Sequence, residues 1–391
     1  MQINKVKLIN WIFYIVICIN LFQEFLYSLN SKFSFLFYFT DALLILIIVI
    51  GISVKNAQQV NKTQIIWWIL FLAYSIFTIL WSSKNLYYIL FRTRYFLQGI
   101  IILFIVQKFV SKENYKKIIK LMCFMQVINL LLSIYQNRIL GLFPDFCNGL
   151  FGYIGYGSGT VGIYSLALSI LSTIYYLDGK WKLFQSLFII GISAAFCAFA
   201  EVKVYYVVFT LSILIIFILR LTSNENYMRG ILVIVTIIVI FYLAYLILEV
   251  VLPNNLATLF NFNDYVQYDS RSNYAGRLNT IPFILNNQFF NSKFLATFGS
   301  GLGTSSSLYI YELGKSFSEV GFLGLCILVI AIICPFIQYL FDKNKTSEKL
   351  FVAVFSVDLL ISIVVWNIPF VRVAVILVFF FIGIANTRWT K

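Results

Sequence analysis

The stretch GFLGLCILVIAIICPFIQYLF at 321–341 decides the fold class, because no charged residue interrupts it. A helix needs about 20 predominantly apolar residues to cross the hydrocarbon core of a bilayer, and this stretch has that length. Similar apolar runs recur along the chain, without the alternation of a barrel strand. Backbone polar groups inside hydrocarbon have to be hydrogen-bonded within their own segment. The runs therefore predict membrane-spanning helices rather than a barrel.

The composition of the 391-residue chain agrees with this prediction. Hydrophobic residues make up 61% of the sequence and charged residues 11%, whereas a soluble domain carries about 25% charged residues. A soluble core has no room for so much apolar surface, so the excess faces lipid. We predict an all-α integral membrane protein, folded as a single polytopic domain over residues 1–391.

About twelve transmembrane helices are predicted from the apolar runs. Their expected positions are 8–29, 33–54, 64–81, 87–109, 117–137, 158–178, 183–200, 203–220, 230–251, 317–341, 349–366 and 369–386. The first run follows Lys5 and Lys7 and is not followed by a small-residue cleavage site. We interpret it as an uncleaved anchor rather than a signal peptide.

The distribution of basic residues predicts the orientation, because cytoplasmic loops carry an excess of Lys and Arg. With the N-terminus inside, 18 of the 29 basic residues fall in inner segments, and SKENYKK (111–117) is the clearest inner marker. Both termini are therefore expected in the cytoplasm. The net charge of +14 is scattered between apolar runs, so membrane topology explains it and a nucleic-acid partner is not expected.

One large polar loop, 252–316, is expected on the outer side between the ninth and tenth spans. Within it, 275–290 is partly amphipathic and predicts an interfacial helix broken near Pro282. The turn GSGLG (299–303) is a weak candidate for cradling phosphate oxygens with backbone N–H groups. A loop that occurs once makes the two halves of the chain unlike, which counts against an inverted-repeat transporter.

The residue inventory excludes some chemistries. The chain has no histidine, which removes the commonest general base and metal ligand. Five of the six cysteines lie in apolar runs, only Cys147 falls in a predicted outer loop, and no metal-ligand spacing occurs. We therefore expect no structural disulfide, no metal and no cofactor.

Charged residues at the edges of spans are the candidates for function, because each is costly in a membrane. In FRTRYFLQG (91–99), Arg92 and Arg94 form either an anion clamp for phosphate or a pair of interface anchors. In AEVKVYYVV (200–208), Glu201 and Lys203 are two residues apart and do not share a helix face. They therefore serve different partners or lie in an unwound turn, the alternative to function being an ordinary polar turn.

Three further positions carry candidates. Glu319, in SFSEVGFLG (316–324), is either a buried general base or a carboxylate that interacts with the dipole at a helix N-terminus. Arg277 lies in the long loop, where a solvated charge is the usual case, and Arg372 opens the last span. The intramembrane acids are expected to pair with the arginines, although Asp358 is also a candidate for an ion pathway. These acids are Glu24, Asp41, Glu249 and Asp358.

The order of these features resembles the O-antigen polymerase and ligase superfamily, in particular the Wzy-type polymerases of capsule and exopolysaccharide pathways. The landmarks are GYGSGTVGIYSLALSILSTIYY (155–176), AEVKVYYVV (200–208), AGRLNTI (275–281), and GSGLG followed by SFSEVGFLG (299–324). The resemblance covers roughly residues 80–340. Its evidence is the order of the motifs, since each motif alone is degenerate.

The resemblance implies a metal-independent, inverting glycosyltransferase that acts outside the bacterial cytoplasmic membrane. Its donor is a growing glycan on undecaprenyl pyrophosphate, and its acceptor is a repeat unit on the same carrier. A flippase and a chain-length regulator are implied as partners. Lys203 and Arg277 match the basic positions that hold pyrophosphate, and Arg92 and Arg94 match a less constant arginine. We count Arg372 and Lys315 with these pyrophosphate contacts.

Two departures bear on the reaction. Lys203 stands where many members have arginine, so a bidentate fork becomes a point charge. The ligase branch has a histidine where this chain reads YELGKSFSE (311–319), which favours a polymerase. Without histidine, a carboxylate is the expected base, with Glu319 first and Glu201 second. The alternatives are a ligase-like transferase and a flippase or solute transporter. If the chain is a glycosyltransferase, its cationic site residues are expected to converge at the outer surface of the membrane.

Overall fold

The computed structural model describes residues 5–54, 60–82, 85–153, 157–221, 238, 242, 280–307, 310–366 and 370–386. All regular secondary structure in this part of the chain is helical. The long helices are α1 (Lys5–Leu29), α2 (Phe35–Ile52), α3 (Lys62–Phe77), α4 (Leu86–Phe109), α5 (Lys112–Arg138), α6 (Gly157–Leu177), α7 (Leu183–Phe199), α8 (Val204–Leu221), α14 (Glu312–Phe341), α15 (Ser347–Val365) and α16 (Arg372–Gly383).

Short helical segments connect or extend these helices. The α-helical ones are α12 (Thr280–Phe283) and α13 (Lys293–Phe298). A π-helical turn covers Ile284–Gln288, and 3-10 turns cover Ser31–Ser34, Thr78–Trp81, Pro144–Phe146, Gly149–Phe151, Thr304–Ser307 and Ile384–Asn386. Side chains cap several N-termini and satisfy orphan backbone donors there. Asn85 accepts from the Tyr87 amide before α4, and Ser111 accepts from the Asn114 amide before α5.

Among the residues that the structure describes, seven helices are long and apolar enough to cross a membrane: Lys5–Leu29, Ser31–Ile52, Lys62–Trp81, Leu86–Phe109, Lys112–Arg138, Gly157–Leu177 and Glu312–Phe341. Three shorter apolar helices follow at Leu183–Phe199, Val204–Arg220 and Arg372–Gly383. The protein is therefore an all-α, membrane-embedded protein. The count of twelve spans stays a prediction, because the expected span 230–251 lies outside the described residues except for Ile238 and Tyr242.

Helix α6 is the centre of the bundle. Of its apolar window 94% is buried, compared with 22% for the window that contains α2, although the mean hydropathy of α6 is the lowest of the seven, at 1.5. It packs against α7, α8 and α15. Small residues make this close approach possible, and a side chain at Gly162 would collide with the Trp366 indole.

Buried polar side chains join α6 to its neighbours. The Gln126 amide of α5 donates to Ser165 Oγ of α6 at 2.9 Å and to Ser193 Oγ of α7 at 3.1 Å. Ser169 Oγ of α6 and Tyr205 Oη of α8 lie 2.8 Å apart. Helices in lipid lack a hydrophobic drive to associate, so such interhelical hydrogen bonds help to hold them together.

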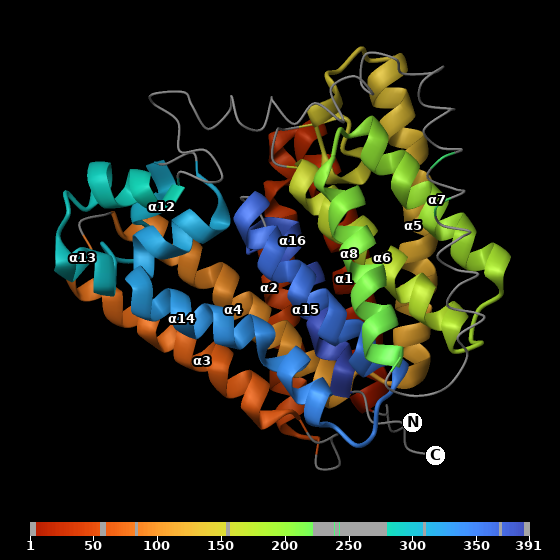
Figure 1. The fold of residues 1–391 in the computed structure, drawn as a ribbon, viewed down its shortest axis with the longest axis horizontal. Helices are drawn as coiled ribbons and strands as arrows, with labels where there is room; N and C mark the ends of the chain where they lie inside the picture. The colour runs from red at the N-terminus through yellow and green to blue at the C-terminus, as the bar shows by residue number, and fades with distance from the viewer. Residues whose placement is uncertain are drawn as a thin grey trace.

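Helices α4, α8, α14 and α16 begin at the upper end of the bundle in Figure 1, where α12 and α13 lie beside α14. The α-helical pattern ends at Phe283, one residue after Pro282, where a break was expected, and a π-helical turn follows from Ile284. Proline lacks a backbone N–H, so it removes a donor from the regular helical pattern at this point. Helix α14 begins at Glu312, before the expected start of the span at 317.

Candidate functional site

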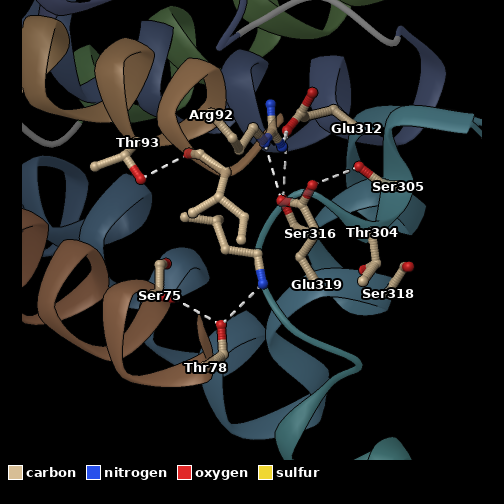
Figure 2. Close-up of polar contacts among 12 residues, drawn as sticks. Ser75, Thr78, Arg92, Thr93, Thr304, Ser305, Glu312, Ser316, Ser318 and Glu319 are labelled. Atoms are coloured by element: carbon tan, nitrogen blue, oxygen red, sulfur yellow. Dashed lines mark hydrogen bonds and ion pairs between the residues drawn. The ribbon is translucent and has the colours of Figure 1, made fainter. Parts of the chain in front are cut away.

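Arg92 is buried near the start of α4 and is held by two carboxylates of α14. Its Nε donates to Glu319 Oε2 at 3.0 Å, and its Nη2 donates to Glu312 Oε1. The residue is 7% exposed. Figure 2 shows the guanidinium directed at both carboxylates. Arg92 is therefore a buried ion-pair centre and not an interface anchor.

Two serine hydroxyls also donate hydrogen bonds to these carboxylates. Ser305 Oγ donates to Glu319 Oε1 at 2.5 Å, and Ser316 Oγ donates to Glu312 Oε1 at 3.4 Å. Both oxygens of Glu319 are thus engaged. Glu312 Oε2 is buried and has no hydrogen-bond partner among the residues that the structure describes. One carboxylate oxygen of the group therefore retains its capacity to accept a proton or a hydrogen bond.

Lys315 supplies a fourth charge. Glu312, Lys315 and Glu319 are separated by three and four residues, so they share one face of α14. Lys315 is half-buried and interacts electrostatically with both carboxylates and with Arg92. We call Arg92, Glu312, Lys315 and Glu319 the Arg92 cluster. Its two positive and two negative charges balance, which is the condition under which ionised groups are tolerated away from water.

The glycine turn at 299–303 fixes the backbone of Glu319. The amide of Ser300 donates to the Ser318 carbonyl at 2.9 Å, and the amide of Gly301 donates to the Glu319 carbonyl at 3.0 Å. Those carbonyls are accessible because α14 is kinked at Gly321, with φ 62° and ψ −166°. Such a backbone conformation favours glycine. The turn therefore positions the carboxylate that faces Arg92.

The expectation that this turn cradles phosphate is wrong. The amides of Ser300 and Gly301 are bonded to α14, and the amide of Leu302 donates to Thr78 Oγ1 at 3.1 Å. The amide of Gly299 is also engaged, since it caps α13 by donating to Leu295. Donors that are already satisfied within the protein are not free to bind an anion.

We expect Gly299→Ala to lower the free energy of unfolding by about 2–3 kcal/mol, because a left-handed backbone costs about 1–2 kcal/mol with a Cβ and overpacking adds to it. Gly299 has φ +83°, and a Cβ there would collide with the Glu319 backbone oxygen. Thermal unfolding in detergent measures the effect.

Two other glycines separate the contributions. Gly141 has φ +64° with open space around it, so Gly141→Ala reports backbone strain alone. Gly191 is helical and also faces open space, so Gly191→Ala is expected to be neutral or to stabilise by up to about 1 kcal/mol. Equal losses for Gly299→Ala and Gly141→Ala contradict the tight docking of the turn.

Arg94 does not join Arg92 in one clamp. Its Nε donates to Asp41 Oδ2 of α2 at 2.6 Å, and its Nη2 donates to the Phe37 carbonyl at 3.0 Å. Residues two apart on a helix point in different directions. Arg92 therefore contacts α14, and Arg94 contacts α2. The role of either arginine in binding pyrophosphate stays a prediction.

Arg372 pairs with a third helix. Its Nη1 lies 3.2 Å from Glu24 Oε2 of α1. Tyr95 of α4 interacts with Arg372, Arg94 and Glu24. The two arginines therefore lie close to the same tyrosine. The prediction that Glu24 and Asp41 pair with the arginines is confirmed.

Glu201 and Lys203 lie in an unwound turn between α7 and α8. Glu201 has φ 54°, which reverses the chain direction. Glu201 Oε1 and Lys203 Nζ lie 3.8 Å apart, so the two charges contact each other across the turn. A two-residue separation excludes a shared face only in a helix, and this turn is not helical. The alternative of an unwound turn is confirmed.

The remaining candidates differ in position. Arg277 and Glu249 lie outside the described residues. Asp358 is buried in α15, where Ser212 Oγ of α8 donates to its Oδ2 at 2.8 Å, and its Oδ1 has no partner in the described ranges. Helices α4, α8 and α16 begin at the same end of the bundle (Figure 1), and Arg92, Lys203 and Arg372 lie in or just before their first turns, but each of these cations contacts its own carboxylates.

Glu312 is the site residue that the sequence reasoning missed. It lies within the predicted polar loop 252–316, although it opens α14 and is fully buried. Its spacing of seven residues from Glu319, with Lys315 between them, indicated one helical face. Glu319 is consequently not at the N-terminus of its helix, and Glu312 takes the place in the first turn.

No protein-family model matches the sequence, and no curated protein matches it either. The chemistry of the described residues and the resemblance in motif order are therefore the two indications of function.

Proposed function

We propose that the protein is a membrane glycosyltransferase of the Wzy polymerase type, which joins oligosaccharide repeat units carried on undecaprenyl pyrophosphate. The observation that carries the proposal is the Arg92 cluster, where two carboxylates and two cations are preorganised at the end of the bundle that adjoins the polar segment 280–316. Acid–base catalysis and charge stabilisation both require groups held in place before the substrate binds.

In the proposed reaction, a hydroxyl of the acceptor sugar attacks the anomeric carbon of the donor. The bond from that carbon to the bridging pyrophosphate oxygen breaks, and its electron pair stays on the oxygen. The hydroxyl proton passes to Glu312 Oε2. Inversion follows from a single displacement. The leaving pyrophosphate gains negative charge, which nearby cations stabilise.

Glu312 replaces Glu319 as the proposed base, because only Glu312 has an unoccupied carboxylate oxygen among the described residues of the cluster. Arg92 and Glu319 act as positioning residues that hold Glu312 through the shared guanidinium. Lys315 is the cation of the cluster assigned to pyrophosphate. Arg277 is assigned there by the motif resemblance.

Lys203 is also assigned to pyrophosphate, and Trp366 supports this assignment. The Trp366 carbonyl accepts from the Glu312 amide at 3.0 Å. Its indole packs at Gly162 of α6, where Val202 also packs. A single tryptophan thus connects the start of α14 to the turn that carries Lys203.

The wider proposal includes about twelve spans, cytoplasmic termini and the bacterial cytoplasmic membrane, with segment 252–316 on the outer side. Donor and acceptor are both lipid-linked, and a flippase and a chain-length regulator act in the same pathway. The reaction needs no metal or cofactor.

An elongation assay tests the proposal. Purified protein in nanodiscs receives synthetic lipid-pyrophosphate repeat units in the presence of EDTA, and the products are separated on a gel. We expect a ladder that survives EDTA and disappears in Arg277→Ala. The absence of a ladder from folded protein with its cognate substrate contradicts the proposal.

A transporter is the second candidate, and Asp358 is the observation that favours it, because a buried carboxylate with an open oxygen is typical of proton and ion pathways. If the protein is a polymerase, the Asp358→Asn variant is expected to elongate at a rate within about threefold of the wild type, because the packing around Ser212 is retained. If the wild type shows no elongation and Asp358→Asn abolishes substrate movement across liposome membranes, Asp358 belongs to a transport pathway instead.

A further inference from the structure

A large cavity opens at the end of the bundle opposite the Arg92 cluster. Its volume is about 1030 Å³. Arg92 lies in the first turns of α4, whereas Lys112, which lines the cavity, begins α5 just after α4 ends. Likewise, Glu312 begins α14, and Tyr339 near its end lines the cavity. The two sites are therefore separated by the length of the helices.

The cavity lining is strongly basic. It contains six cationic and two acidic side chains, contributed by four separate parts of the chain. The cationic residues are Lys112, Lys116, Lys120, Lys180, Arg220 and Lys345, and the acidic residues are Asp178 and Glu348.

Both acidic groups are already paired within the protein. Glu348 Oε1 lies 2.9 Å from Lys180 Nζ, and Asp178 pairs with Arg220. Neither Lys116 nor Lys120 has an ion-pair partner in the described part of the chain. The cavity consequently keeps an excess of positive charge after its internal pairs are counted.

The spacing on α5 increases this excess. Lys112, Lys116 and Lys120 are each four residues apart, so they lie on one face of the helix. Like charges at this spacing repel one another and destabilise a helix. A bound anion removes that repulsion, which gives the row of lysines a role as a binding surface.

One wall of the cavity is built from buried hydrogen bonds. Tyr115 Oη and Tyr175 Oη lie 2.8 Å apart, and Tyr175 Oη donates to Glu348 Oε1 at 3.3 Å. Tyr115 is 1% exposed and Glu348 2%. The Trp181 ring packs edge-on against Tyr175. Because these groups are fixed before a ligand arrives, little ordering cost opposes binding.

We propose that this cavity binds an anion that carries two or more phosphate groups. Lysine ammonium groups bind phosphate as point charges, and several converge here. The volume suits a molecule of ligand size rather than a simple ion. The excess of basic residues on the cytoplasmic side explains positive charge at this end, but it does not require a cavity whose lysines converge. The ligand comes either from solution, as a polyphosphate, or from the membrane, as the headgroup of an acidic phospholipid.

Binding of two probes to the full-length protein tests the proposal. Tripolyphosphate is titrated into detergent-purified protein by calorimetry, and cardiolipin retention is measured by native mass spectrometry. The variant is Lys116→Gln combined with Lys120→Gln. The matched control is Lys117→Gln, because Lys117 is an exposed lysine of the same helix that does not line the cavity.

We expect at least one probe to bind saturably, and its affinity to fall about tenfold or more in the double variant, because two charge-assisted contacts to phosphate are removed. Lys117→Gln stays within about twofold of the wild type. Binding of tripolyphosphate alone identifies a soluble ligand, and binding of cardiolipin alone identifies a lipid headgroup. If neither probe binds saturably, or if Lys117→Gln weakens binding as much as the double variant, the proposal is wrong. All three lysines are exposed, so the variants are expected to fold.

Discussion

Replacing Arg92 by methionine is expected to lower the free energy of unfolding by about 3–5 kcal/mol, the cost of leaving buried charges without their partner. Arg92 is the hydrogen-bonded cation for two carboxylates of α14, each almost completely buried. Methionine fills a similar volume but offers no donor. Both carboxylates then have to take up protons or draw water into the bundle.

Thermal unfolding in a mild detergent measures this loss, with Arg94→Met as the matched control. Arg94 lies on the same helix, but its ion pair with Asp41 is about a quarter exposed on each side. Its loss is therefore expected to cost about 1 kcal/mol or less. Adding Glu312→Gln and Glu319→Gln to Arg92→Met should recover most of the stability, because the uncompensated charges are removed. Equal losses for the two arginine variants contradict the assignment of Arg92 as the buried centre.

Glu312→Gln is expected to lower the elongation rate by about 10²–10⁴-fold, the usual contribution of a general base. Glutamine keeps the shape of the side chain and still accepts a hydrogen bond from Arg92. Its amide does not take the proton of the acceptor hydroxyl. Stability should change little in comparison, since Arg92 remains paired with Glu319.

The role of the base is separated from a structural role by chemical rescue. Added formate enters the space left by Glu312→Ala and supplies a carboxylate, so part of the elongation rate should return. Glu319→Ala is expected to lose activity through misplacement of Arg92, and formate should not restore it. Rescue of Glu319→Ala alone reverses the two assignments and returns Glu319 to the role of base.

The sequence predicts the existence and approximate positions of the helices better than the residues at which they begin and end. Uninterrupted apolar runs have only one stable conformation in lipid, so their positions could be read directly. The start of α14 was placed too late because Glu312 to Ser316 is polar. That segment is helical since its side chains pair with other protein groups instead of meeting lipid.

The candidate site could be predicted only as separate charges. Arg92 and Glu319 were both identified, but 227 residues separate them in the chain. Their pairing depends on how α4 packs beside α14, which no local pattern encodes. The same reason explains the glycine turn at 299–303. Its sequence predicts free backbone amides, but in the folded protein the amides of Ser300 and Gly301 donate to carbonyls of α14.

The central position of α6 has a consequence for biosynthesis. This helix combines the lowest mean hydropathy of the seven candidate spans with the highest burial, and the hydroxyl of its Ser169 pairs with Tyr205 of α8, which is synthesised later. When α6 leaves the ribosome, that partner does not yet exist, whereas Gln126 of α5, which donates to Ser165, is already made. The final packing of α6 is therefore expected only after α8 has been synthesised.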